Sequence, residues 1–155
     1  MRKMILSLII SFMLFSCDSG EQEIIVVPKD YKGYVLIIFN QKDGIPTKYE
    51  GKKRVYEIPQ NGVLKTQFTG NEGWREFPEY YYERITPDNK LPSFGEIKKV
   101  PIDTVVGFIG ANGTVKKSAE SEERIEFVEF YIGTKSQIEQ AQQELEKLGI
   151  VKLAQ

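Results

Sequence analysis

Reactive side chains of only a few kinds are present in this chain of 155 residues. It contains one cysteine and no histidine. The lack of histidine excludes Ser-His-Asp and Cys-His nucleophiles, imidazole acids or bases, and histidine-ligated zinc. Chemistry based on paired carboxylates stays open, because two acids suffice for glycoside cleavage. The densest candidates are Glu122, Glu123, Glu126 and Glu129, which equally fit the solvated flank and outward face of a strand. We predict no catalytic residues, no metal site and no cofactor.

A second group of candidate residues is aromatic and lies between positions 74 and 82. Trp74 is the only tryptophan, and Tyr80, Tyr81 and Tyr82 follow it. In a strand, Tyr80 and Tyr82 share one face and Tyr81 faces the other way. If their face is exposed, Trp74, Tyr80 and Tyr82 could stack on sugar rings or anchor a protein partner. The alternative, which we favour, is that these side chains fill the core and that Trp74 closes one end of it.

The single cysteine follows an apolar segment at the amino terminus. A basic start precedes the apolar run of residues 4–15, which is shorter than the roughly 20 residues that a membrane-spanning helix needs. This pattern is typical of a signal peptide, here residues 1–16. The run ends in Leu14-Phe15-Ser16-Cys17, which resembles the lipobox of bacterial lipoproteins. The resemblance implies cleavage before Cys17, a diacylglycerol on its thiol, and a further fatty acid such as palmitate on the new amino group. Several chains together give a stable membrane anchor.

The mature chain would begin with a short acidic segment. Residues 17–23 are small, polar and acidic, so we expect a flexible tether ahead of one domain over residues 24–155. Acids in this place resemble a surface-export signal of some Gram-negative bacteria, whereas Asp18 alone resembles the inner-membrane retention signal of enteric bacteria. A solvated spacer without a sorting role explains the same residues equally well. We expect a cell-envelope protein, with the outer membrane favoured and surface exposure left open. The chain carries 21 basic and 22 acidic residues, and loss of the basic start makes it more acidic, which disfavours nucleic acid as a partner.

The pattern of the remaining chain predicts short β-strands separated by Gly, Pro and Asn. We expect strands at residues 24–27, 34–39, 54–58, 63–68, 77–85, 105–109, 114–117 and 125–132. Residues 59–62 and 110–113 contain Asn-Gly pairs that predict hairpin turns. The apolar positions of the last strand change parity, which suggests a bulge near Val128 and Glu129.

One helix follows the last strand. Thr134 to Gln137 have the form of a capping box, apolar residues then recur at helical spacing, and Gly149 is placed to end the helix. Residues 150–153 could add an edge strand. About seven or eight short strands and one C-terminal helix predict a mainly β fold, either a sandwich or a partly open barrel, with a subdomain break expected near residues 86–95.

Two motifs in the middle of the chain resemble one known family. Residues 28–35 have the pattern Pro-x-x-Tyr-x-Gly-x-Val, and residues 58–66 have the pattern Ile-Pro-x-x-Gly-x-Leu-x-Thr. Together with the three tyrosines at 80–82, these motifs are similar to a family of uncharacterised bacterial secreted and lipoprotein β domains. The resemblance covers roughly residues 24–92. It implies an envelope β domain and brings no known activity or site residue.

We therefore predict an envelope lipoprotein that is not an enzyme. It would be held to a membrane by lipid on Cys17, and its β domain would bind a protein partner or support an envelope complex. The first alternative is a carbohydrate-binding module that uses Trp74, Tyr80 and Tyr82. A carboxylate-dependent hydrolase is the third and least favoured interpretation.

Overall fold

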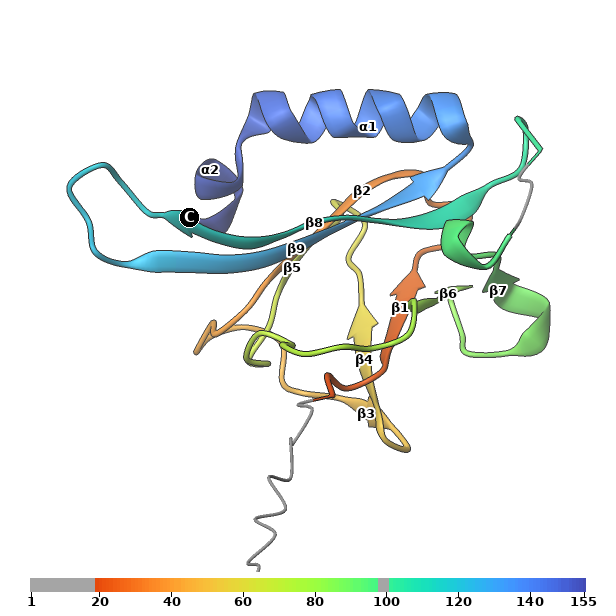
Figure 1. Ribbon diagram of the computed structural model, residues 1–155, viewed down its shortest axis with the longest axis horizontal. Coiled ribbons are helices and arrows are strands. Elements are labelled where there is room, and N and C mark those ends of the chain that lie inside the picture. Colours follow the sequence, from red (N-terminus) through yellow and green to blue (C-terminus); the bar gives the residue numbers. More distant parts are fainter. Residues whose placement is uncertain (1–18, 98–100) are drawn as a thin grey trace, which may run out of the picture.

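The computed structural model describes residues 19–97 and 101–155, so Cys17 and the predicted signal peptide lie outside the described part. The domain has three layers (Figure 1). Helix α1 (Lys135–Leu148) covers one face of a four-stranded sheet, and the other face of that sheet packs on a five-stranded sheet. Among the described residues, no helix is both long and apolar enough to span a bilayer.

The five-stranded sheet lies farthest from α1 (Figure 1). Its order is β3-β4-β1-β6-β7, and the central strand β1 (Glu23–Val27) runs parallel to both neighbours. These neighbours are β4 (Lys53–Glu57) and β6 (Glu79–Tyr82), and the short antiparallel strands β3 (Tyr49–Glu50) and β7 (Lys90–Leu91) form the edges. All five residues of β1 are buried, as expected for a parallel strand covered on both faces.

The four-stranded sheet has the order β5-β2-β9-β8. Strand β5 (Val63–Lys65) is parallel to β2 (Gly33–Ile38), and β9 (Arg124–Gly133) is antiparallel to both β2 and β8 (Val106–Lys116). The hairpin of β8 and β9 extends well beyond the rest of the sheet (Figure 1). The fold is therefore a mainly β sandwich, with nine strands in the described part of the chain, and the predicted fold class is confirmed.

Both faces of the four-stranded sheet are apolar, and this explains the parity change in the last strand. Val128, Phe130 and Ile132 pack between the sheets, whereas Ile125 and Tyr131 pack under α1. A bulge is present opposite the predicted place, Val128 and Glu129, but it is not in this strand, because the alternation of β9 is regular and each face has its own apolar cover. The extra residue lies in β8, where the register shifts between Ile109 and Asn112.

Both predicted hairpin turns are wrong, because turn residues do not determine which strands pair. The turn at residues 59–62 passes from one sheet to the other: β4 pairs with β1, and β5 pairs with β2. The Gly-Ala-Asn-Gly stretch at 110–113 lies inside β8. The chain reverses farther on, where the Lys117 N–H donates to the Glu123 carbonyl at 3.0 Å.

The helix begins and ends as its sequence predicts. The Thr134 N–H donates to the Gln137 side chain at 3.0 Å, and Gly149, at φ 78°, donates to the Leu145 carbonyl. Ile138, Ala141 and Leu145 are buried against the sheet. Residues 150–153, expected as an edge strand, belong instead to a second short helix, α2 (Ile150–Ala154).

The segment between the two halves of the chain contains two short 3-10 helices, η1 (Pro87–Asn89) and η2 (Phe94–Glu96). The core between the sheets includes residues from both sides of this segment, among them Ile25 and Phe130. At the other end, the chain from Ser19 onward lies against the domain. Gly20 donates to the Trp74 carbonyl at 3.0 Å, and Glu21 donates to the Asn71 side chain at 2.9 Å. The described residues of the expected tether, from Ser19 onward, are therefore hydrogen-bonded to the domain and do not form a flexible linker.

Candidate functional site

The three aromatic residues selected from the sequence do not form one surface. Trp74 is 73% exposed, whereas Tyr80 is 1% exposed and lies in the core between the sheets. Tyr82 is half-buried against the same core, and its hydroxyl donates to the Tyr31 carbonyl at 3.3 Å. The core interpretation is therefore confirmed for Tyr80 and is wrong for Trp74. Since Tyr80 is enclosed, it cannot contact a ligand at the surface.

Tyr80 also lacks the properties of a reactive phenol. Burial, followed by the negative charges of Glu23 and Glu96, raises the pKa of Tyr80 well above its ordinary value. Its hydroxyl is the one buried side-chain polar atom without a hydrogen-bond partner among the residues described. Tyr80 stays neutral at physiological pH, and its ring packs edge-on against Phe130 with centroids 6.2 Å apart.

The four glutamates of the last strand and its turn do not converge on a cleft. Glu126 and Glu129 are an odd number of residues apart in the regular strand β9, so they project from opposite faces. Glu126 accepts from the Asn40 side chain at 2.8 Å, and Glu129 accepts from the Tyr131 hydroxyl at 2.8 Å. Glu122 and Glu123 lie in the exposed turn of the hairpin, paired with Lys116 and Lys117 at 3.3 and 3.0 Å.

A carboxylate with the wrong pKa for acid catalysis lies on β6. Burial raises the pKa of Glu79, but hydrogen bonds from Lys53 and Tyr81 outweigh that effect and leave it below the ordinary value. A general acid requires the opposite shift. Within residues 19–97 and 101–155, no group of three or more metal-ligating side chains is found either.

A buried ion pair next to Trp74, between Glu23 and Arg75, was not predicted from the sequence. The side chain of Glu23 is fully buried and accepts from Arg75 Nε at 2.9 Å, from Asn71 at 2.8 Å and from the Tyr56 hydroxyl at 3.3 Å. Arg75 also donates to the Asn71 carbonyl at 2.8 Å. These bonds fasten the loop that carries Trp74 to the start of β1. No sequence pattern indicates these bonds, because Glu23 follows other acidic residues and resembles part of the tether.

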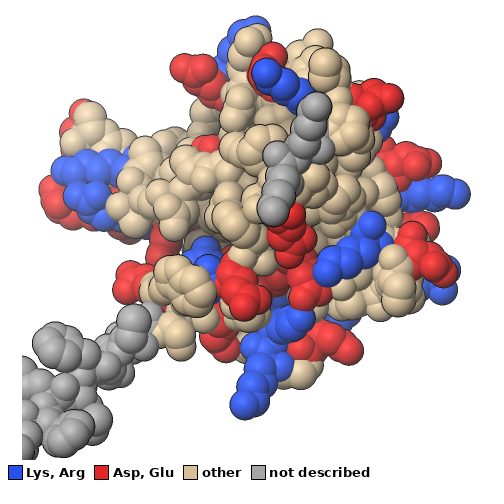
Figure 2. Space-filling model, turned by 45° about the vertical axis from the view of Figure 1, so that its right-hand side comes forward, with Lys and Arg blue, Asp and Glu red and all other residues tan. Residues whose placement is uncertain are grey.

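The surface around this loop is acidic. Glu72 and Glu76 are exposed on either side of Trp74, and neither forms an ion pair with another described residue. Arg75, the basic residue between them, is occupied by Glu23. Acidic side chains lie close to the point where the described chain begins (Figure 2).

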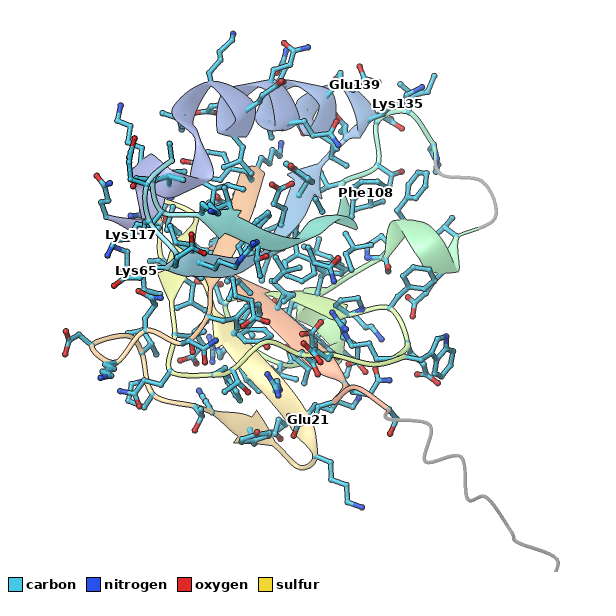
Figure 3. All side chains as sticks on the ribbon, turned by 60° about the vertical axis from the view of Figure 1, so that its left-hand side comes forward. Glu21, Lys65, Phe108, Lys117, Lys135 and Glu139 are labelled. Carbon is cyan, nitrogen blue, oxygen red and sulfur yellow. The ribbon has the colours of Figure 1, made fainter. Side chains whose placement is uncertain are left out.

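An apolar hollow lies elsewhere, between η2, the start of β8 and the first turns of α1. It has a volume of about 410 Å³. Its described walls are apolar and its rim is polar: the walls are Phe94, Pro101, Ile102, Val106, Phe108 and Ile138, and the rim is Lys135, Glu139 and Gln142. We call this hollow the apolar groove. Figure 3 shows Phe108 on β8 below Lys135 and Glu139 of the helix.

Aromatic packing holds the groove in shape while leaving part of it exposed. The rings of Phe94 and Phe108 meet edge-on with centroids 5.3 Å apart, and Phe108 in turn lies 6.4 Å from the ring of Tyr131. Ile102 is 83% exposed and Phe94 is 49% exposed. Large apolar side chains that cluster on a surface mark binding sites more often than single exposed ones. The sequence could not identify the groove, because Phe94 and Ile102 lie in irregular segments without periodic pattern.

Comparison with known proteins assigns the chain to a family without an assigned activity. The sequence profile of the Family of unknown function (DUF6843) matches residues 19–142, so the chain belongs to that family. The predicted membership in an uncharacterised family of bacterial domains is confirmed. Comparison with curated proteins gives no match.

A solved structure shares the fold. It is the crystal structure of a "Putative Lipoprotein from Bacillus anthracis", with a TM-score of 0.55 and 12% sequence identity. The similarity covers 83% of this chain and 91% of that one. At this identity the likeness establishes the common fold.

Proposed function

We propose that this chain is an envelope lipoprotein, anchored through Cys17, whose domain binds a protein partner in the apolar groove. The groove itself carries the proposal. Val106 and Phe108 on β8 and Ile138 on α1 form the ordered part of its walls, so these residues need little ordering when a partner binds. An apolar centre surrounded by Lys135, Glu139 and Gln142 has the composition of a protein interface, with an apolar core and a polar rim.

The anchor is supported by the sequence. Cys17 is the only cysteine, it follows Leu14-Phe15-Ser16, and it ends an apolar run of signal-peptide length. The structural neighbour from Bacillus anthracis is itself described as a lipoprotein. We favour the outer membrane as the site of attachment, because the residues after Cys17 are acidic as in surface-export signals.

Binding is preferred over catalysis because the acids of the chain are either paired or dispersed. Glu126 and Glu129 project from opposite faces of β9, and the lowered pKa of Glu79 keeps it ionised. The carbohydrate alternative loses its main support, since Tyr80 is enclosed, Tyr82 is half-buried, and Trp74 alone of the three aromatic residues is largely exposed. A sugar platform normally needs more than one exposed ring to hold a ligand.

In-cell cross-linking with affinity recovery tests this proposal. Ile102→Asp places a charge in the groove at a side chain that is 83% exposed, so the fold should be unaffected. Ile45→Asp is the matched control, because Ile45 is an exposed isoleucine, 56% accessible, outside the groove. We expect a stoichiometric protein partner with the wild type and with Ile45→Asp, and loss of that partner with Ile102→Asp.

A third variant separates the anchor from the groove. The Cys17→Ala protein should be secreted without lipid and should no longer bind a partner that is itself a membrane protein. If the same proteins are recovered with Ile102→Asp as with Ile45→Asp, the groove is not the binding site. If a small molecule rather than a protein copurifies and is lost only with Ile102→Asp, the groove binds a ligand and the protein-partner proposal is wrong.

A further inference from the structure

The exposed Trp74 lies next to the point where the chain leaves the domain towards Cys17. Ser19 and Trp74 form a parallel β-bridge, and the Gly20 N–H donates to the Trp74 carbonyl at 3.0 Å. Trp74 is 73% exposed, and the described contacts give it no cover. An amphipathic ring of this size is costly to leave in water, and tryptophan is enriched where proteins meet the membrane–water interface.

Chain length fixes how far Trp74 can be from the anchor. Cys17 is two residues before Ser19, and two residues span at most about 7 Å. Bridged residues in neighbouring strands are roughly 5 Å apart. The backbone of Trp74 therefore lies within about 12 Å of the residue that would carry the lipid. A lipid in the bilayer at Cys17 therefore brings the backbone of Trp74 within reach of the headgroup region.

The loop that carries Trp74 is held firmly. Arg75 donates to the buried Glu23 at 2.9 Å, and Asn71 donates to the same carboxylate at 2.8 Å and to the Glu21 carbonyl at 2.7 Å. Trp74 lies between these two fastened residues, so its backbone is held in place while its side chain is 73% exposed. A held loop loses less backbone entropy when it enters an interface than a mobile one.

The charge of the same surface selects the kind of bilayer. Glu72 and Glu76 flank Trp74, and the guanidinium groups of Arg54 and Arg75 are occupied by Glu21 and Glu23. Lys52, in the turn between β3 and β4, is an exposed basic residue on the other side of the same segment, so the surface has no basic excess. Anionic lipids attract basic surfaces and repel acidic ones. A zwitterionic bilayer surface is the better match.

We infer that Trp74 inserts into the headgroup region of a zwitterionic bilayer beside the lipid on Cys17, and that this contact fixes the orientation of the domain on the membrane. The inference rests on the proposed lipidation of Cys17. In the resulting orientation the apolar groove points away from the bilayer. Figure 3 shows Glu21, near the start of the described chain, at the opposite end of the molecule from Lys135 and Glu139 of the groove.

The test uses the fluorescence of Trp74, the only tryptophan of the chain. The lipoprotein is purified in detergent, its N-terminal mass is measured, and it is reconstituted into phosphatidylcholine vesicles with or without doxyl-labelled phosphatidylcholine. We expect the emission maximum to move to shorter wavelength in vesicles, doxyl groups near the headgroup to quench the emission, and iodide to quench it less than in the unlipidated Cys17→Ala protein.

A second reporter controls for simple proximity to the vesicle. In the Trp74→Phe background, Ile102→Trp places the only tryptophan at the groove, where the native isoleucine is 83% exposed. This reporter should stay accessible to iodide and should be quenched less by doxyl lipid. Replacing part of the phosphatidylcholine by phosphatidylglycerol should weaken the quenching of Trp74, and stronger quenching would contradict the choice of a zwitterionic surface.

The outcomes separate this inference from the proposed function. If the mass shows lipid on Cys17 but Trp74 is quenched no more than the Ile102→Trp reporter, membrane insertion of Trp74 is refuted and the lipoprotein assignment stands. If the mass shows no lipid on Cys17, both are overturned. Equal, strong quenching at both positions would show that the domain lies on its side, and the inferred orientation would be wrong.

Discussion

Replacing Arg75 by alanine should destabilise the domain strongly, although Arg75 lies in a loop. The Glu23 carboxylate is fully buried, and Arg75 Nε approaches its Oε2 at 2.9 Å. Asn71 and Tyr56 donate to the other oxygen, Oε1, at 2.8 and 3.3 Å. Arg75→Ala therefore leaves a buried negative charge with two neutral donors and an unpaired oxygen.

The size of the effect follows from this geometry. Removing one partner of a buried ion pair costs about 3–5 kcal/mol. Because Asn71 and Tyr56 still donate to Glu23, we expect the lower end, about 3 kcal/mol. Against a total stability of roughly 5–15 kcal/mol, that is a large fraction. With urea slopes of about 1–3 kcal/mol per molar, the unfolding midpoint should fall by roughly 1–3 M.

Urea unfolding followed by far-ultraviolet circular dichroism measures the loss. Lys117→Ala is the matched control, since the Lys117–Glu123 pair has a similar length, 3.0 Å, but side chains that are 53% and 72% exposed. An exposed pair of this kind contributes at most about 1 kcal/mol. If Arg75→Ala costs no more than Lys117→Ala, the buried pair does not fasten the Trp74 loop as described.

Three further predictions concern the core around β6. Gly107→Ala would place a Cβ 2.3 Å from the ring of Tyr80 and should lower stability by about 1–3 kcal/mol in thermal unfolding, whereas Gly113→Ala in the same strand has nothing within 4 Å and should change little. Tyr80→Phe removes a buried hydroxyl that has no partner among described residues, so calorimetry should show a gain of about 1 kcal/mol; a loss would mean that the hydroxyl is needed. Burial, and then the hydrogen bond to Glu79, raises the pKa of Tyr81 from 10.0 to about 12. The neutral phenol stabilises the fold fully below pH 10, and this contribution is lost as the pH rises to about 12. In urea unfolding, the free energy of unfolding of Tyr81→Phe should therefore depend less on pH in that range than the free energy of unfolding of the wild type.

The local features of the fold could be predicted from the sequence. The alternation and β-branched composition of the strands, the capping residues of α1 and the position of Gly149 each depend on neighbouring residues only. The strand pairing could not be predicted. The turn at residues 59–62 has hairpin chemistry, yet it joins β4 and β5 of different sheets, because β1 provides a long-range parallel partner for β4.

The candidate sites could be predicted only in part. Burial of Tyr80 follows from the usual place of aromatic residues in a sheet, and the same rule is wrong for Trp74, whose exposure depends on contacts of its loop with residues more than fifty positions away. The groove depends on packing of irregular segments against α1, and no periodic pattern marks Phe94 or Ile102. The glutamates between positions 122 and 129 are close in sequence, but closeness in sequence does not show which carboxylates share a cleft in the folded domain.

Photo-cross-linking from the apolar groove in living cells tests most directly whether the groove binds a protein partner. A photoreactive amino acid replaces Ile102 in the lipidated protein, and the same residue replaces Ile45 as a control of similar type on another surface. We predict one discrete cross-linked protein from position 102 and none of that mass from position 45. Absence of a product at 102, or identical products from both positions, would contradict a partner-binding groove.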